Sequence, residues 1–586
     1  MIMNKKTLIF FFTSIFFLLI FFFFESSKLQ SLILNQSAYF ALPSNKILDF
    51  LLNSNWLFLF ISFFFFVSAF NWNTKSSSST LISTLNFDSQ IKKLIILFFL
   101  IFITIIFAWG NITNPNFWYD ESGQFWIAKG LNHFSPMFSQ NGDLYAVLQN
   151  NANFNMDPGG FSLILHYWTK VSNAPIFLRL LPYCFFLISF LIIVLIVKEW
   201  FPNAGVLVLS SGFILLIFSL TRSYAFELRP YSFEMASALL SLFVAQISNR
   251  ICLSKHYSII FGILLSLCLT SRYSSVIPIF SACIFYCYSS FQNYKNKSVI
   301  KNSFLFFSPI LIALLFNLLM LVNQNVQVDT PEYVNEFMLA TNSATNIFLH
   351  LGSILIWLPM VILVLICVCN LKSTMTLKIK KYLIFSFIVT TIFTLLSLAG
   401  KYPLSFRTRW DISIVSIYSL SLIPLIYFIF YYYSKLLKIP VKIFSQSLQI
   451  AVVAIGIFYL SFKNSFIDTT INYYDSVYDD FQSCYTKLLS GRILANRNAM
   501  PTIKYLFEYG PLIEYKNVYT KIDWYNEKDL INNTTAKSKN INLKNYSYAI
   551  FTQIDKKLIP YSFLESNFFS DCSTNNGLSL MYIRKN

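Results

Sequence analysis

The chain has 586 residues, of which 56% are hydrophobic, 19% are aromatic and only 12% are charged. This composition excludes a soluble globular protein and predicts a polytopic helical membrane protein. The formal net charge of +18 does not indicate a nucleic-acid-binding protein, because the basic residues stand singly between apolar runs and form no long basic block.

About thirteen apolar runs are long enough to cross a bilayer as helices. The first, 8–24, ends in FFFFESSK without a small-residue cleavage site, so we predict an uncleaved span rather than a signal peptide. The others lie near 55–71, 93–109, 175–197, 204–221, 232–249, 257–271, 274–291, 303–322, 346–369, 382–399, 411–431 and 444–462. The two runs on either side of Arg272 are short, so one broken hairpin is the alternative there.

Lysine placement orients these spans. If the N-terminus is cytoplasmic, the inner loops carry eighteen basic residues, seventeen of them lysine, whereas outer loops such as 323–337 are acidic and hold no basic residue. This orientation places the long loop 110–174 and the tail from about 463 outside the membrane.

Two carboxylate sites occur in the loop 110–174. Asp120 and Glu121 are adjacent in WYDESGQFWIAKG, and Asp157 lies in the turn NMDPGG ahead of an aromatic-rich run. Ionisable groups near lipid are costly and are therefore functional candidates. The alternative is that they are N-caps of two short interfacial helices.

Arginine is distributed differently from lysine. Of the ten arginines, six fall at or near the outer ends of predicted spans: Arg179, Arg222, Arg229, Arg272, Arg407 and Arg409. A guanidinium fork matches phosphate oxygens and stays charged when partly desolvated, so this cluster predicts a site for a phosphorylated lipid. The alternative is that each arginine reaches from a helix end to the headgroups.

The tail from about 463 is polar and rich in Asn, Tyr and Lys. Its runs YAIFTQI and LSLMYIRKN predict strands, and SVYDDFQSCYTKLL and MPTIKYLFEYGPLIEY predict helices. The expected fold class is therefore an all-α polytopic membrane protein with a small C-terminal α/β domain outside the membrane.

Seven of the nine cysteines lie in or beside predicted spans, and Cys484 and Cys572 are alone in the tail. In an oxidising compartment we expect these two to form a disulfide, the alternative being two free thiols.

The four histidines, His133, His166, His256 and His350, are isolated, so no histidine metal site is predicted. A divalent cation, Mg²⁺ or Mn²⁺, on Asp120 and Glu121 is a minority alternative.

Five motifs follow one another along the chain in this order: WYDESG, DPGGFSLILHYW, FLRLLPYCFF, RSYAFELRPYSFEMASALLSLF and GILLSLCLTSRYSS. This order resembles polytopic glycosyltransferases of the GT-C fold, in the bacterial branch related to protein O-mannosyltransferases and lipid A aminoarabinose transferases (glycosyltransferase family 39-like). The resemblance covers roughly residues 90–290, with a weaker similarity in SFRTRWDISIVSI. It implies a catalytic membrane core over 90–462, preceded by two extra spans in 1–89 and followed by the domain 463–586.

By position, the resemblance implies that Asp120 is the catalytic aspartate and Glu121 its acidic neighbour. Arg179 matches the arginine that begins the next span, and Glu227, Arg229 and Tyr231 match an Arg-Pro-Tyr segment. The full set of candidate substrate-binding residues is Asp157, Arg179, Glu227, Arg229, Tyr231, Arg272, Tyr273, Arg407 and Arg409.

The implied activity is transfer of a sugar from a polyprenyl-phosphate donor to a lipid, glycan or protein of the cell envelope. It would take place at the outer face of the bacterial inner (plasma) membrane, with Asp120 as general base and with inversion at the anomeric carbon. Two alternatives are a ligase or polymerase of surface polysaccharide and a flippase or transporter of lipid-linked sugars. The chain contains no nucleotide-binding fingerprint, and no repeated halves of the kind found in many transporters are visible.

Overall fold

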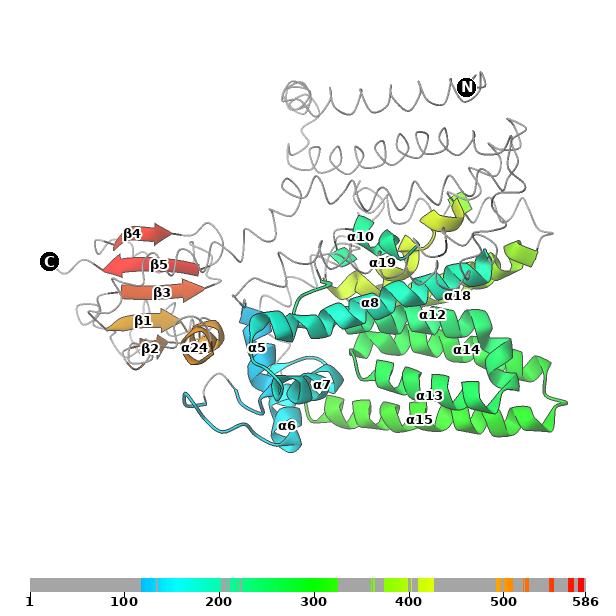
Figure 1. Cartoon of the computed structure of the whole chain (residues 1–586), viewed down its shortest axis with the longest axis horizontal. Coiled ribbons are helices and arrows are strands. Elements are labelled where there is room, and N and C mark those ends of the chain that lie inside the picture. The colour runs from blue at the N-terminus through cyan, green and yellow to red at the C-terminus, as the bar shows by residue number, and fades with distance from the viewer. Residues whose placement is uncertain are drawn as a thin grey trace, which may run out of the picture.

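The computed structural model describes residues 117–324 with short gaps, 374–398, 409–425 and separate segments between 360 and 402 and between 492 and 583. The predicted spans at 8–24, 55–71, 93–109 and 444–462 lie outside the described residues, as do Arg222, Arg407 and Cys484. The described part is mainly helical, and Figure 1 shows its helices lying side by side in one bundle.

Among the described residues, five helices are long and apolar enough to cross a membrane. They are α8 (Pro175–Trp200), α12 (Tyr231–Leu253), the continuous helix Tyr273–Gln292 that contains α14 (Val276–Gln292), α15 (Lys297–Val322) and α18 (Thr374–Leu398). Each coincides with a predicted span. α13 (Lys255–Leu269) is apolar but shorter. It ends before Arg272 and α14 begins after it, so the two short apolar runs on either side of Arg272 form two separate helices.

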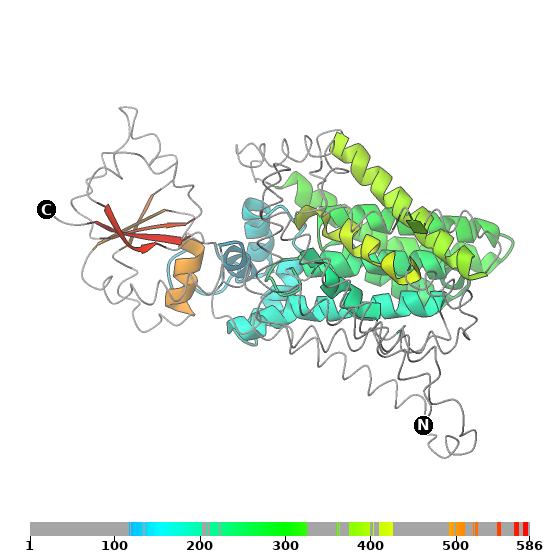
Figure 2. The same ribbon diagram turned by 90° about the horizontal axis from the view of Figure 1, so that it is seen from above.

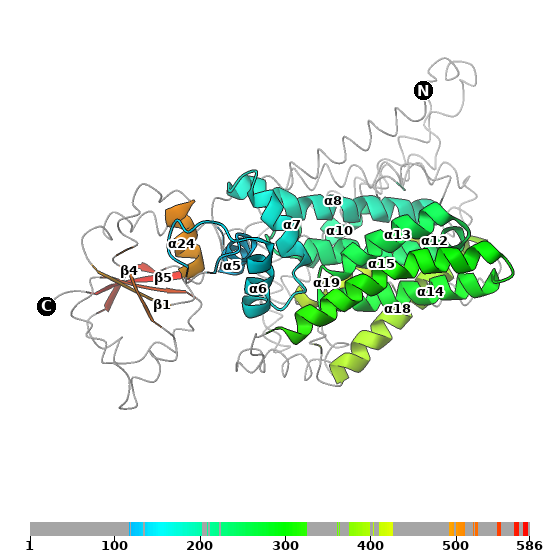
Figure 3. The ribbon, with the colours of Figure 1, turned by 90° about the horizontal axis from the view of Figure 1, so that it is seen from below.

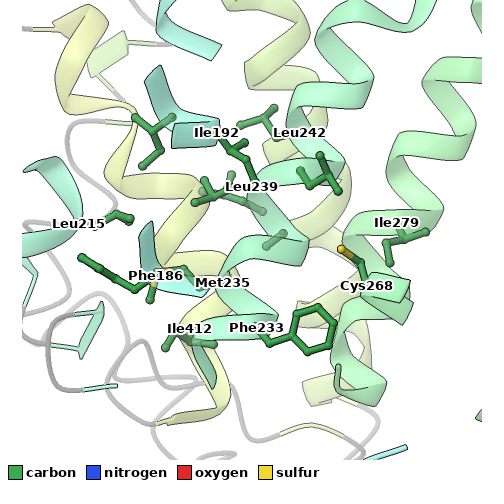
Figure 4. Close-up of a cluster of buried hydrophobic side chains, with 14 of the residues drawn as sticks. Phe186, Ile192, Leu215, Phe233, Met235, Leu239, Leu242, Cys268, Ile279 and Ile412 are labelled. Atoms are coloured by element: carbon green, nitrogen blue, oxygen red, sulfur yellow. The ribbon is translucent and has the colours of Figure 1, made fainter. Parts of the chain in front are cut away.

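Helix α12 is the centre of the bundle. It packs against α8, α13, α14 and α19 (Ile412–Ser419), and nearly all of its side chains are buried. Small residues such as Ala238, Ser241 and Ala245 let neighbouring backbones approach closely, which is how membrane helices gain packing energy. In the close-up of Figure 4, Leu239 of α12 lies between Phe186 and Ile192 of α8 and Ile412 of α19.

A glycine sets the contact between α13 and α15. A Cβ on Gly262 would lie 2.6 Å from the carbonyl oxygen of Phe306, so only glycine allows this separation of the two backbones. The side chain of Asn317 then donates to the carbonyl of Leu269 at the end of α13 (2.7 Å).

Three short helices gather at one end of the bundle: α5 (Tyr119–Ala128), α6 (Leu144–Phe154) and α7 (Gly160–Thr169). They occupy the predicted loop 110–174. Figure 3 shows the same grouping from below, with α5 and α6 between the membrane helices and the strands. This end of the bundle is also where α8 and α12 begin and where α13 ends.

The C-terminal segments form a five-stranded sheet in the order β2-β1-β3-β5-β4. Its strands are β1 (Ile493–Asn496), β2 (Ile522–Tyr525), β3 (Tyr548–Thr552), β4 (Phe568–Ser573) and β5 (Leu578–Ile583). β1 runs parallel to β2 and β3, and β5 runs antiparallel to β3 and β4. Strands therefore occur at the two predicted positions, near 548 and 578.

One helix, α24 (Met500–Glu508), lies between this sheet and α5, as Figure 2 shows from above. It is the beginning of the helix predicted from residue 500. α24 thus has the sheet on one side and, on the other, α5, which it contacts and which carries Asp120.

Candidate functional site

Carboxylates and arginines meet where α5, α7 and the start of α12 come together with the turn at Arg272 and the 3₁₀ turn η4 (Arg409–Asp411). These segments are far apart in the sequence. The bundle brings together Asp120, Glu121, Asp157, Arg179, Arg272 and Arg409 through hydrogen-bonded ion pairs. The resulting cluster contains acids and bases in direct contact, rather than arginines that point separately to the headgroups.

Asp120 is paired with Arg409. The Nη1 atom of Arg409 donates to Oδ2 of Asp120 over 2.7 Å, across a sequence separation of 289 residues. The side chains are 18% and 23% exposed respectively, which makes this the most open carboxylate–arginine pair of the cluster. Asp120 lies in the first turn of α5, so its carboxylate is at the end of the helix that favours negative charge.

Glu121 is held by three donors. Nε and Nη2 of Arg179 donate to its two oxygens at 3.1 and 2.9 Å, and the backbone N–H of Leu228 donates to Oε1 at 2.9 Å. The carboxylate is 3% exposed and the guanidinium 5%. Glu121 therefore ties α5 to α8 and to the segment before α12, and in this arrangement Arg179 is occupied by a protein carboxylate.

Arg272 joins two further acids. Its Nε donates to Oδ1 of Asp157 at 3.0 Å and its Nη1 donates to Oε2 of Glu234 at 2.7 Å. The guanidinium also lies over the rings of Tyr231 and Trp410, with distances of 5.0 and 4.9 Å to their centroids. A buried arginine between two carboxylates and two aromatic faces is a positioning group for the surrounding helices.

Glu234 was not among the predicted site residues. It is fully buried in the first turn of α12, and its Oε1 accepts from the hydroxyls of Ser274 (2.6 Å) and Ser413 (2.8 Å). A single acidic residue inside an otherwise apolar span was the sequence signal for it. Glu234 connects α12, the turn after Arg272 and α19.

Asp157 is not the N-cap of α7, because Gly159 occupies that position with a φ of 95°. The backbone N–H of Gly160 donates to the carbonyl of Thr270 at 3.1 Å, and a Cβ at Gly160 would collide with Thr270. The Pro-Gly-Gly turn thus brings the Asp157 loop directly onto the Arg272 turn. The N-cap of α6 is a different aspartate, Asp143, which accepts from the N–H of Ala146 at 2.9 Å.

The segment before α12 contains Glu227 and Arg229, both partly buried. The Oε1 atom of Glu227 and the Nε atom of Arg229 are buried and have no hydrogen-bond partner in the described part of the chain, and the same is true of the Tyr273 hydroxyl. Burial, followed by the charges of Glu121 and Asp120, raises the pKa of Glu227 well above its usual range, although Arg229 and Arg409 partly offset this.

The other face of α5 packs against α24. Nε1 of Trp126 donates to the carbonyl of Pro501 at 3.0 Å, and the ring of Tyr505 lies 4.5 Å from that of Phe117, measured between centroids. The Nζ atom of Lys504 donates to the carbonyl of Ser135 at 2.7 Å. α24 therefore packs on α5 next to Arg179, whose guanidinium lies 4.9 Å from the centroid of the same Phe117 ring.

Within the described residues, no three His, Cys, Asp or Glu side chains are grouped as metal ligands. Both oxygens of Glu121 accept from Arg179, so the two carboxylates proposed for a divalent cation are each bound to an arginine in this arrangement. His166 contacts the carbonyl of Ala128 through Nδ1 at 2.8 Å, as expected of an interfacial packing residue. The Cys484–Cys572 pair lies outside the described side chains and stays a prediction.

No protein-family model matches the chain. Among curated proteins, no significant match was found either.

Proposed function

We propose that the protein is a membrane glycosyltransferase of the GT-C type, which moves a sugar from a polyprenyl-phosphate donor to a cell-envelope acceptor. The observation that carries this proposal is the contrast around Asp120. Of the carboxylates that pair with an arginine in this cluster, Asp120 is the most exposed and is held at 2.7 Å by Arg409, while Glu121, Asp157 and Glu234 are in buried contacts with arginines. A general base must be accessible to the acceptor, and Asp120 meets that requirement.

The reaction needs a base and a positive charge in the same place. Asp120 takes the proton of the acceptor hydroxyl as its oxygen attacks the anomeric carbon, and the donor phosphate leaves. Arg409 and Arg229 stabilise the negative charge that grows on the phosphate, an effect worth several kcal/mol in a site with little water, about 3 by analogy with single oxyanion donors. A retaining mechanism would need a second carboxylate as nucleophile, and Asp157 is almost completely buried against Arg272, which favours direct displacement with inversion.

The proposed topology puts this site on the outer face of the membrane. Asp120, Arg179 and Arg272 lie at the end of the bundle where α8 and α12 begin, whereas the ion pairs of Glu199 with Arg250 and Lys378 lie at the opposite end. The predicted inner loops contain 17 lysines, whereas the outer loop 323–337 contains no basic residue, which supports an N-terminus in the cytoplasm. In the same scheme, the sheet and α24 belong to a small extracytoplasmic α/β domain over 463–586.

The test is transfer of a labelled sugar from a set of polyprenyl-phosphate sugars to a cell-envelope extract by the purified protein in lipid. We expect transfer by the wild type and by Asp143→Asn, a matched control in the same loop that keeps its capping oxygen, and no transfer by Asp120→Asn. Failure of the wild type with every such donor would contradict the proposal.

The same experiment separates the two alternatives. Movement of a labelled lipid-linked sugar across a vesicle membrane without a new glycosidic bond would indicate a flippase or transporter. Transfer of a preassembled glycan chain in place of a single sugar would indicate a ligase or polymerase.

A further inference from the structure

Most charged groups of the site satisfy one another, but three buried polar atoms remain without a hydrogen-bond partner among the described residues. They are Oε1 of Glu227, Nε of Arg229 and the hydroxyl of Tyr273. A buried polar atom without a partner costs about 1–3 kcal/mol. Glu227 and Arg229 are two residues apart and interact electrostatically, so their two unpartnered atoms indicate a place that a bound molecule completes.

Glu227 differs from the other acids of the cluster because it takes part in no ion pair among the described residues. Its neighbour Leu228 donates a backbone N–H to Glu121, which fixes the Glu227 segment against the start of α5. The charged and titratable groups that face Glu227 are Asp120 and Glu121 from α5, Arg409 from η4, Arg229 and Tyr224 from its own segment, and Tyr231 from α12.

Two of these neighbours, Asp120 and Glu121, are carboxylates that already have arginine partners. A third negative charge in the same partly buried space is unfavourable, because burial and like charges both oppose ionisation. Asp120 and Glu227 thus have different surroundings. Asp120 accepts a hydrogen bond from Arg409, whereas the buried Oε1 atom of Glu227 has no hydrogen-bond partner among the described residues. When the surroundings of two carboxyl groups differ in this way, one acts as a base and the other as an acid.

We propose that Glu227 is held as a neutral carboxylic acid beside Asp120 and donates its proton to the phosphate that leaves the sugar, while Arg229 binds the same phosphate. This inference rests on the proposed function and adds a general acid to it. It also assigns the unpartnered Arg229 Nε to an anionic ligand, since the guanidinium has no carboxylate partner in the described residues.

The step is balanced as follows. The acceptor oxygen forms a bond to the anomeric carbon as the bond from that carbon to the phosphate oxygen breaks, and the electron pair of the broken bond stays on the phosphate. The acceptor proton goes to Asp120, and the proton of Glu227 goes to the phosphate oxygen. Polyprenyl phosphate leaves as a singly protonated monoester, and proton exchange from Asp120 to Glu227 through solvent restores both groups.

The variant that tests this step is Glu227→Gln, which keeps the shape of the side chain and its hydrogen-bond donor but has no proton to release. We expect kcat to fall by about a hundredfold or more with little change in KM for the donor, as is typical on removal of a general acid. Wild-type kcat should fall at high pH as Glu227 ionises, and the variant should lack this high-pH limb. Glu199→Gln, at the far end of the bundle, is the control and should behave as wild type.

A donor with a better leaving group distinguishes an acid from a positioning residue. With a non-bridging sulfur in the donor phosphate, the leaving group is a weaker base, so the loss in Glu227→Gln should shrink by at least about tenfold if proton donation is the missing function. Equal losses with both donors would overturn the general-acid role. An active Glu227→Gln with an unchanged pH profile would overturn it as well, while leaving the proposed function intact.

An infrared measurement tests the neutral acid without any transfer assay. The wild type at neutral pH should show the carbonyl stretch of a protonated carboxylic acid, and this band should disappear both in Glu227→Gln and on raising the pH. Absence of the band in the wild type would overturn the proposal even if Glu227→Gln fails to fold. If the band is present but the wild type transfers no sugar from any polyprenyl-phosphate donor, the proposed function fails, and with it the role of phosphate as proton acceptor.

Discussion

The site contains two kinds of carboxylate–arginine contact. The ion pairs of Glu121 with Arg179, and of Arg272 with Asp157 and Glu234, are almost completely buried. The pair of Asp120 with Arg409 is about a fifth exposed on each side. The same chemical groups thus serve two purposes. A buried ion pair holds helices together, whereas in an exposed ion pair a ligand can replace one partner.

The largest effect should come from the open pair. Asp120→Asn preserves shape but removes the proposed base, and we expect a loss of transfer on the order of a thousandfold or more. The unfolding temperature in detergent should change little, because the pair is partly solvated. A rate above about a tenth of wild type would remove Asp120 from the mechanism.

The buried contacts should respond in the opposite way. Glu121→Gln or Arg272→Leu leaves a partner charge buried without compensation, which should lower the free energy of unfolding by about 3–5 kcal/mol. Thermal unfolding of the purified variants measures this, with Asp120→Asn as the matched control. If Glu121→Gln and Asp120→Asn are equally stable, the distinction between structural and open pairs fails.

A smaller effect is expected at arginines that retain their charge. Arg229→Lys should raise KM for the lipid-phosphate donor by about tenfold, because an ammonium replaces the guanidinium fork. Arg250→Lys is the control: this arginine makes two hydrogen bonds with Glu199 at the other end of α12 and is largely exposed. Similar KM values for the two variants would contradict the phosphate-binding role.

The smallest effect concerns the packing of α24 on α5. Burial lowers the pKa of Lys504 to about 8 from its ordinary 10.5, with Glu508 partly opposing the shift. Between these two values the unfolded chain binds more protons than the folded chain, so stability should rise as the pH is raised from 8 to 10.5. Unfolding temperatures over this range should show the rise in the wild type, and it should be weaker in Lys504→Met; equal slopes would contradict the assignment.

Much of the described bundle could be predicted from the sequence, because apolar length alone locates α8, α12, α14, α15 and α18. The acidic loop and the outward arginines could also be assigned to one end. Their pairing could not be, because Arg409 was one of several outward arginines and nothing local indicates that it, rather than Arg229, contacts Asp120. Glu234 and Trp410 were missed for the same reason: their roles arise only when α12, the Arg272 turn and α19 meet.

The sequence separations of the three contacts have a consequence for biosynthesis. Glu121 meets its arginine 58 residues later, Asp157 meets Arg272 after 115 residues, and Asp120 meets Arg409 only after 289. Chains fold as they are made, with earlier segments first. The two buried ion pairs can therefore form before Arg409 has been synthesised, whereas Asp120 acquires its partner only afterwards. A chain that ends before residue 409 can form both buried pairs but lacks the arginine that contacts Asp120.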